Sequence, residues 1–374
     1  MMMEEEIKSL IKVWILALAS LSYCYFIVGK IPKGKTRFFF LLPILFYFTI
    51  LPSTISFISL KGVIAFFFTW LANFKLLLLC FDQGPLSSNQ PKSSLKSFIS
   101  IACLPIKIKQ DDPSLKSPYS NIKNKKNPSH QNKQSNPSHH HLETPPKPFL
   151  SLPIIILLTL LVVHLYCTNN QIINPSLLLV LYLYLSLEIV LAIGATLARA
   201  TLGLELELQS NEPYLSPSLQ DFWGRRWNLM ITEILRPTVY HPTRRISTRI
   251  FGRKWASLPA VLVTFLVSGL MHELILFYMN KIGPTWEVTW FFVLHGICTA
   301  MEIGVKRALA GKWQLHRLVS GPLAVGFVVV TTMWYFLPPV VRSGSDLGIK
   351  ESGAAIEFFR EKLISAPKLL HCII

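Results

Sequence analysis

A histidine and an asparagine, each in an unusual stretch of the chain, are the residues best suited to carry chemistry. His272 lies inside the apolar segment LVSGLMHELILFY (266–278), and Asn228 ends the stretch PSLQDFWGRRWN (217–228). An imidazole can accept or donate a proton near neutral pH, and a primary amide can donate hydrogen bonds to a substrate oxygen. A buried site using both groups is one interpretation. A structural hydrogen-bonding role for His272 is the other.

The stretch 217–228 is predicted to begin a helix. Ser218, followed three residues later by Asp221, resembles a capping box, and Pro237 is expected to end the helix near residue 235. At 100° per residue, a helix over 219–235 would have three distinct faces. These are an apolar stripe of Trp223, Trp227, Met230, Ile231 and Ile234, a charged face of Arg225, Arg226, Glu233 and Arg236, and a third face of Gly224, Asn228 and Thr232.

Two interpretations of this helix remain open. In the first it is an interfacial anchor, with Trp223 and Trp227 among lipid headgroups and the arginines toward phosphate. That role does not account for the third face. Gly224, one turn before Asn228, would open space beside the amide, as a substrate site requires.

The chain has the composition of an integral membrane protein. Of its 374 residues 51% are hydrophobic and only 15% charged, yet the formal net charge is +17. Nucleic-acid binding is not expected from a chain with such long apolar runs. We predict an all-α bundle with eight candidate spans, at roughly 10–28, 38–52, 55–80, 148–167, 175–199, 258–279, 286–304 and 319–341.

Eight spans place all the strongly basic loops on one side, which the positive-inside rule makes cytosolic. The predicted organisation is an N-terminal helical part (1–81), a basic loop (82–147), a core (148–341) containing the cytosolic loop 201–257, and a tail (342–374). Within the basic loop, the part from about 108 is expected to be disordered, and 97–109 is predicted to be an interfacial segment.

Five ionisable residues fall inside the predicted spans, where each should face protein or a water-filled cavity. Around His272, Ser268 lies one turn earlier and Gly269 removes bulk. His272 is about 14 residues from the cytosolic end of its span, or about 21 Å, so a substrate would reach it through a tunnel or from the bilayer. The five residues are Glu188, His272, Glu273, His295 and Glu302.

Other common chemistries lack their motifs. The chain contains no HExxH, no GxSxG, no Walker A sequence and no dinucleotide fingerprint. The six cysteines have no metal-ligand spacing, and three adjacent histidines at 139–141 lie in a segment expected to lack a rigid scaffold. No metal site is predicted.

Several stretches together make the chain resemble the plant wax synthase-like branch of the membrane-bound O-acyltransferase superfamily. They are FDQGP (81–85), CLPIKIK (103–109), SLQDFWGRRWN (218–228), ILRPTVYHP (234–242), SGLMHELILFY (268–278) and FFVLHG (291–296). The resemblance implies a multi-helix enzyme of the endoplasmic reticulum that encloses a buried catalytic tunnel. It would transfer a fatty acyl group from acyl-CoA, as co-substrate and without a cofactor, to a lipid alcohol.

The resemblance also implies roles for individual residues. His272 would be the catalytic base that removes the hydroxyl proton, and Asn228 its amide partner, stabilising the thioester oxygen or orienting the substrate. Trp223, Gly224, Trp227, Ser268 and His295 would contact substrate. The candidates for binding CoA phosphates are Arg225, Arg226, Arg236, Arg244 and Arg245.

Four functions stay open on sequence alone. The leading one is wax-ester synthesis on a long-chain fatty alcohol, and the nearest rival is the same reaction on a sterol. A non-enzymatic lipid or solute carrier would also place buried carboxylates and histidines along a pathway. An inactive scaffold is the fourth.

Overall fold

The computed structural model describes residues 2–55, 58–87, 94–105, 151–168, 173–202, 209–280, 283–309, 315–343 and 349. In this part of the chain all regular structure is helical, as predicted. The α-helices are α1 (Met2–Phe26), α2 (Lys35–Ile50), α3 (Ile58–Ile64), α4 (Asn73–Cys80), α5 (Leu95–Cys103), α6 (Leu152–Cys167), α7 (Pro175–Leu202), α8 (Leu219–Asp221), α9 (Leu229–Leu235), α10 (His241–Trp255), α11 (Ser257–Asn280), α12 (Glu287–Ala308), α13 (Arg317–Thr331) and α14 (Leu337–Arg342).

Seven of the eight predicted spans are confirmed as apolar helices long enough to cross a membrane. Two of them are composite, because π-helical stretches at Ala65–Ala72 and Thr332–Phe336 join α3 to α4 and α13 to α14. The remaining predicted span corresponds to α6, which has only 16 residues. At 1.5 Å per residue α6 extends about 24 Å, less than the ~30 Å of a typical hydrocarbon core.

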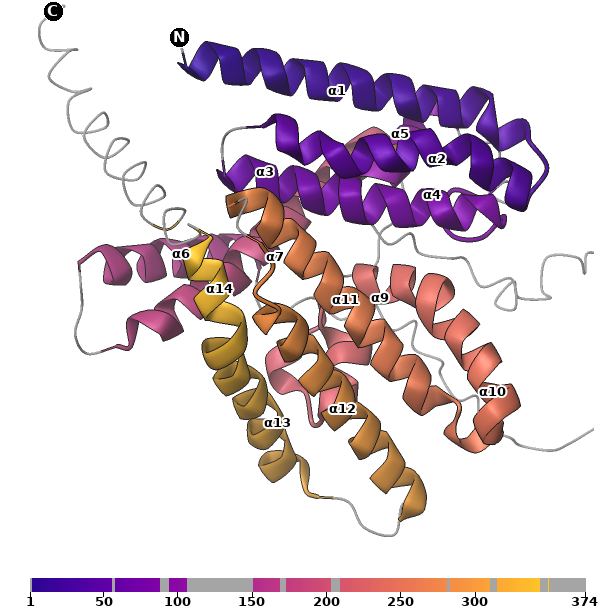
Figure 1. Cartoon of the computed structure of the whole chain (residues 1–374). Helices are drawn as coiled ribbons and strands as arrows, with labels where there is room; N and C mark the ends of the chain where they lie inside the picture. The colour runs from indigo at the N-terminus through magenta and orange to yellow at the C-terminus, as the bar shows by residue number, and fades with distance from the viewer. Residues whose placement is uncertain are drawn as a thin grey trace, which may run out of the picture.

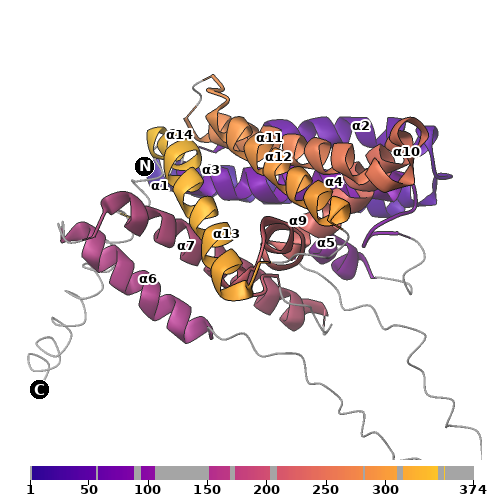
Figure 2. The same ribbon diagram turned by 90° about the horizontal axis from the view of Figure 1, so that it is seen from below.

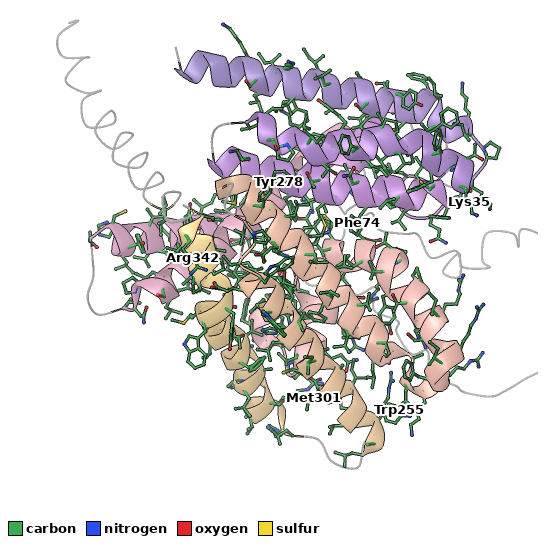
Figure 3. The ribbon with its side chains drawn as sticks, in the orientation of Figure 1. Lys35, Phe74, Trp255, Tyr278, Met301 and Arg342 are labelled. Carbon is green, nitrogen blue, oxygen red and sulfur yellow. The ribbon has the colours of Figure 1, made fainter. Side chains whose placement is uncertain are left out.

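The helices form two groups that meet along α3 and α11 (Figures 1 and 2). The N-terminal helices α1 to α4 lie side by side, and α11, α12 and α13 cross the molecule at an angle to them. Helices α6 and α7 form a hairpin at the edge. At the junction of the two groups, the Tyr278 hydroxyl donates a hydrogen bond to the carbonyl of Thr49 (Figure 3).

A buried lysine joins the N-terminal helices to α5. Lys75 is 1% exposed, and its ammonium donates to the carbonyls of Ile101 at 2.6 Å and Leu104 at 2.8 Å. These carbonyls belong to the last turn of α5, where a cation also complements the helix dipole. The structure therefore corrects part of the interfacial prediction for 97–109, because Phe98 to Cys103 pack into the N-terminal core. Residues 106–109 lie outside the described residues.

A close contact joins α5 to α7 and to the segment that leads to Asn228. Pro105, just after α5, lies against Gly194 of α7, and its carbonyl accepts a hydrogen bond from the Gln209 side chain. A Cβ at Gly194 would stand 2.7 Å from Cγ of Pro105, so the missing side chain is what permits this packing.

The helix ends that carry the predicted basic loops are expected to lie on one side of the molecule. In Figure 3, Lys35 and Trp255 lie to the right of Tyr278 and Arg342. The sidedness of the basic loops, and which side faces the cytosol, stay predictions.

We predict that Gly194→Ala destabilises the folded protein by about 1–3 kcal/mol, because the added methyl group overpacks the contact with Pro105. The measurement is the thermal unfolding of the full-length protein in detergent micelles. Gly326→Ala is the matched control, since Gly326 is also helical and a Cβ there meets nothing within 4 Å. Equal melting temperatures for the two variants would show that the Pro105 contact is not tightly packed.

Candidate active site

The segment containing Asn228 is not the single helix that its periodicity predicts. Ser218 does cap a helix, accepting a hydrogen bond from the Asp221 amide at 3.2 Å, but α8 passes into a π-helical turn at Phe222–Arg226. Trp227 is extended, and a new helix, α9, starts at Leu229. The α-helix does end at Leu235, as predicted, but Pro237 does not end the helical backbone, because a π-helical stretch, Arg236–Tyr240, continues into α10.

Asn228 occupies the turn between the two helical pieces. Its backbone is left-handed, with φ 38° and ψ 65°, a conformation that asparagine tolerates better than most residues. Its side-chain oxygen accepts a hydrogen bond from the amide of Ile231 at 3.4 Å and so caps α9. Among the described residues, nothing accepts a hydrogen bond from the Asn228 NH2 group. The amide therefore has donors left for another molecule.

Polar side chains from α12 hold the start of this segment. The Glu302 carboxylate accepts hydrogen bonds from the amides of Leu219 at 2.9 Å and Gln220 at 3.3 Å, which are free donors at the start of α8. Lys306, one turn later, pairs with Glu302 at 2.5 Å and donates to the Ser218 hydroxyl. The structural interpretation of Glu302 is thus supported.

A second connection to α12 runs through His295, one of the predicted substrate contacts. The Trp223 indole donates to Nδ1 of His295 at 3.1 Å, so Nδ1 carries no proton and Nε2 must carry it. Nε2 lies 2.9 Å from the hydroxyl of Thr331, which donates to the carbonyl of Phe327. With both ring nitrogens bonded and the side chain fully buried, His295 positions Trp223. Contact of His295 with substrate stays a prediction.

The two tryptophans pack against protein, contrary to the interfacial-anchor interpretation. Trp223 lies in an aromatic cluster between α11 and α12, with ring centroids 5.6 Å from Phe265 and 6.0 Å from Phe292. Trp227 is stacked between Phe222 at 5.6 Å and Tyr184 of α7 at 5.9 Å. These rings fix the π-helical turn from both sides.

His272 stands in a ring of aromatic side chains that the sequence did not reveal. Phe292 of α12 stacks on the imidazole at 4.4 Å, and Trp70 meets it edge-on at 4.9 Å. Phe336, from the π-helical stretch after α13, contacts it at 5.9 Å. Three segments far apart in the chain therefore surround one ring.

The hydrogen bond of His272 determines which ring nitrogen is basic. Nδ1 lies 2.8 Å from the backbone carbonyl of Ser268, one turn earlier on α11. Because a carbonyl oxygen can only accept, Nδ1 must carry the proton, and Nε2 keeps its lone pair. Ser268 thus contributes through its backbone, whereas a role for its hydroxyl stays a prediction. His272 and His295 have opposite tautomers, and only His272 has a free basic nitrogen.

Small residues let α11 and α12 approach closely around this site. A Cβ at Gly269 would lie 3.0 Å from Cα of Thr289, and one at Gly296 would lie 2.9 Å from Cβ of Phe265. Glu273, next to His272, accepts hydrogen bonds from the amide of Trp286 at 2.9 Å and from Thr289, at the start of α12. Its carboxylate, 6% exposed, therefore has a structural role in joining the two helices.

The five arginines predicted to bind CoA differ in their surroundings. Arg226 pairs with Asp221 at 2.6 Å and donates to the carbonyls of Asn211 and Glu212, so it braces the loop. The side chain of Arg225 is 79% exposed. Arg236 is exposed and donates to the carbonyl of Gly224 at 3.1 Å, where a Cβ would meet nothing within 4 Å. Arg244 and Arg245 are exposed on α10. Phosphate binding by any of the five stays a prediction.

The two predicted catalytic residues converge through shared neighbours. Phe292 contacts both His272 and Trp223. The residues that follow Asn228 on α9 share an apolar cluster with Trp70 and Met271, which flank the histidine. The segments that carry His272 and Asn228 are therefore packed against common neighbours, whereas a site formed jointly by the two side chains stays a prediction. Among the described residues, no three His, Cys, Asp or Glu side chains are placed to hold a metal ion, and 139–141 lie outside them.

Comparison with known proteins identifies close relatives of the chain. Residues 207–294 match the model of the membrane bound O-acyl transferase family. A long-chain-alcohol O-fatty-acyltransferase of Simmondsia chinensis is 44% identical over 97% of this chain and 99% of its own. A probable long-chain-alcohol O-fatty-acyltransferase 3 of Arabidopsis thaliana is 43% identical, covering 97% and 98%. An acyl-CoA–sterol O-acyltransferase 1 of the same plant is 42% identical over 89% of this chain and 91% of its own.

We predict that Trp223→Phe lowers the free energy of unfolding by about 1–3 kcal/mol, because it leaves Nδ1 of His295 buried without its donor. Thr331→Val should act similarly at Nε2. The measurement is thermal unfolding of the single and double variants. Trp290→Phe is the control, since Trp290 lies on α12, the helix that carries His295, and is 62% exposed. If the two losses simply add, His295 does not couple Trp223 to Thr331.

Proposed function

Because this chain belongs to the membrane-bound O-acyltransferase family, we propose that it transfers a fatty acyl group from acyl-CoA to the hydroxyl of a long-chain fatty alcohol, forming a wax ester. The single observation that carries the mechanism is the hydrogen bond from Nδ1 of His272 to the Ser268 carbonyl. It leaves Nε2 as a free base inside the helical bundle.

In the proposed reaction, Nε2 of His272 takes the proton of the alcohol as its oxygen attacks the thioester carbon. The new C–O bond forms, the C–S bond breaks, and the proton passes to the departing CoA sulfur, so that ester and free thiol are the products. No covalent acyl-enzyme is needed. The three aromatic side chains around His272 support this role, because they keep the imidazole in one orientation and exclude bulk water.

Asn228 is proposed to donate its free NH2 group to the thioester oxygen, on which negative charge develops during attack. The left-handed turn supports this role, since the side-chain oxygen is used for capping and only the donors remain. Gly224 precedes Asn228 at a position with open space, which would admit substrate past Trp223 and Trp227.

The CoA phosphates are proposed to meet Arg225 and Arg236. Both side chains are exposed, and Arg236 is held beside Gly224 by its bond to that carbonyl. Guanidinium groups suit phosphate oxygens because they present several N–H donors in one plane. Arg226 contributes indirectly, by holding the loop on which Arg225 stands.

The protein is a multi-pass membrane protein by its seven apolar helices and its family. We propose that it lies in the endoplasmic reticulum with its basic loops toward the cytosol. The net charge of +17 and its concentration in alternate loops support that orientation. Acyl-CoA would then arrive from the cytosol and the alcohol from the bilayer, through the predicted tunnel.

A sterol is the second candidate acceptor. The observation in its favour is that the relative named for sterol acylation is almost as similar to this chain, at 42% identity, as the relatives named for long-chain alcohols. The proposed proton transfer is the same for both alcohols. The choice between them depends on the shape of the space near His272.

We predict that His272→Ala lowers the rate of acyl transfer by about 10²–10⁴-fold, because the base is lost. Asn228→Asp should lower it by about 10²–10³-fold, since aspartate keeps the turn and the cap but removes the donors. Microsomes containing each variant would be assayed with labelled acyl-CoA and a fatty alcohol.

The controls separate chemistry from folding. Asn228→Gly keeps the left-handed backbone but removes the side-chain amide. Its rate of acyl transfer should therefore fall as far as that of Asn228→Asp. Near-normal activity in Asn228→Gly would reduce Asn228 to a turn residue. Undiminished transfer by a folded His272→Ala protein would refute the base assignment.

We predict that the chain makes wax esters when expressed in yeast lacking its own neutral-lipid acyltransferases and supplied with a C16–C18 fatty alcohol. Lipid extracts would be profiled by mass spectrometry, and the His272→Ala protein is the blank. Sterol esters as the main product would establish the second acceptor instead. An absence of both esters, with the protein present in the membrane, would favour a carrier or an inactive scaffold.

A further inference from the structure

Helix α10 is strongly cationic and almost wholly exposed. Its sequence, HPTRRISTRIFGRKW, contains five cations and no acidic residue. Among the described residues, no carboxylate pairs with any of the five. Ser247 is the one buried side chain of the helix. The five cations are Arg244, Arg245, Arg249, Arg253 and Lys254.

The same helix also exposes large apolar side chains. Ile246 is 62% exposed, Ile250 is 70% exposed and Phe251 is 54% exposed. Exposed apolar residues of this size beside unpaired cations are unusual on a surface that faces only water. Neither property alone identifies the surface that α10 contacts. Together they require a surface that offers both negative charge and apolar contact.

The helical spacing separates the apolar residues from the cations. Ile246 and Ile250 are four residues apart and share one edge of α10. Arg245 and Arg249 immediately precede them and form the adjoining edge, about 100° away. Ser247 faces the protein on the other side of the isoleucines. The outer surface of α10 is therefore an apolar ridge with a basic flank.

The position of α10 brings this surface to the membrane. Two residues after Trp255, the span of α11 begins at Ser257, and α10 lies alongside the outer end of that span (Figure 1). Arg307, at the end of the α12 span, donates a hydrogen bond to the carbonyl of Lys254. Lys254 itself lies 5.3 Å from the Trp255 ring, an arrangement suited to the headgroup region.

We propose that α10 is an interfacial helix that binds anionic phospholipid headgroups through its basic flank, with Ile246 and Ile250 in the acyl boundary. A bilayer offers both contacts at once: negative phosphates for the arginines and hydrocarbon for the isoleucines. A single CoA molecule fits less well, because the cations extend over 11 residues, from Arg244 to Lys254, and lie on both sides of the non-helical residue Gly252. Arg245 is thereby assigned to lipid.

The first arm of the test measures which face of α10 contacts lipid. Ile250→Cys and His241→Cys would each carry an NBD fluorophore in the full-length protein, in a background where Cys167, Cys298 and Cys372 are replaced by serine. His241 is the matched control, since it is exposed and lies about 180° from Ile250 on the helix. In nanodiscs, the Ile250 probe should have bluer emission and be quenched at least about twofold more by lipids brominated in the acyl chain.

The second arm measures the dependence on lipid charge. Quenching at Ile250 should increase when about 30% phosphatidylglycerol is added to phosphatidylcholine, and 0.5 M KCl should reverse the increase. Arg249→Gln with Arg253→Gln should remove the increase while the KM for acyl-CoA stays unchanged.

Three results would overturn the proposal. Equal emission and quenching at the two positions would place α10 in water. Blue emission without bromolipid quenching would mean that protein covers the ridge. If quenching does not change with lipid charge, or if the double arginine variant has a raised KM for acyl-CoA, the basic flank has a role other than binding anionic lipid.

Discussion

Irregular backbone packed against a helical bundle must have its buried polar groups bonded by the protein, because burial removes water as a partner. The segment 209–228 contains such backbone, and side chains supply several of the bonds: the Glu302 carboxylate of α12 accepts hydrogen bonds from the amides of residues 219 and 220. Arg226 holds the carbonyls of residues 211 and 212. Two backbone bonds, from Leu229 to Gln209 and from Asn211 to Arg226, close the loop on itself. The left-handed turn at Asn228 exists because this framework surrounds it.

Helix α12 unites the two halves of the candidate site. Along one helix, Phe292 stacks on His272, His295 receives the Trp223 indole, and Glu302 fastens the start of α8. The two histidines have similar aromatic surroundings but opposite protonation patterns, imposed by their partners. A carbonyl beside one ring leaves that ring a basic nitrogen, and an indole and a hydroxyl beside the other leave none. Composition alone would treat these two residues as equivalent.

Much of the architecture was predictable because span length and hydrophobicity are local properties. Seven spans, the cap at Ser218 and the structural use of Glu302 follow from patterns within one helix or from the cost of intramembrane charge. The break at Asn228 was not, because the local periodicity favours a continuous helix and the backbone bonds that flank the break, from Leu229 to Gln209 and from Asn211 to Arg226, join residues 20 and 15 positions apart. The aromatic side chains around His272 were not predicted for a similar reason, since Trp70 and Phe336 are far from His272 in sequence.

The burial of Lys75 has a consequence for how the protein enters the membrane. Its ammonium donates hydrogen bonds to the carbonyls of Ile101 and Leu104, which the ribosome adds 26 and 29 residues later. During that interval the span of residues 61–80 holds a charge without these acceptors. Such a charge disfavours insertion by about 2.5–3.5 kcal/mol at mid-membrane and by less toward the end of a span, where Lys75 lies. The first three spans therefore become a stable unit in the bilayer only when α5 docks, and synthesis of α5 sets the earliest moment at which the N-terminal helices are complete.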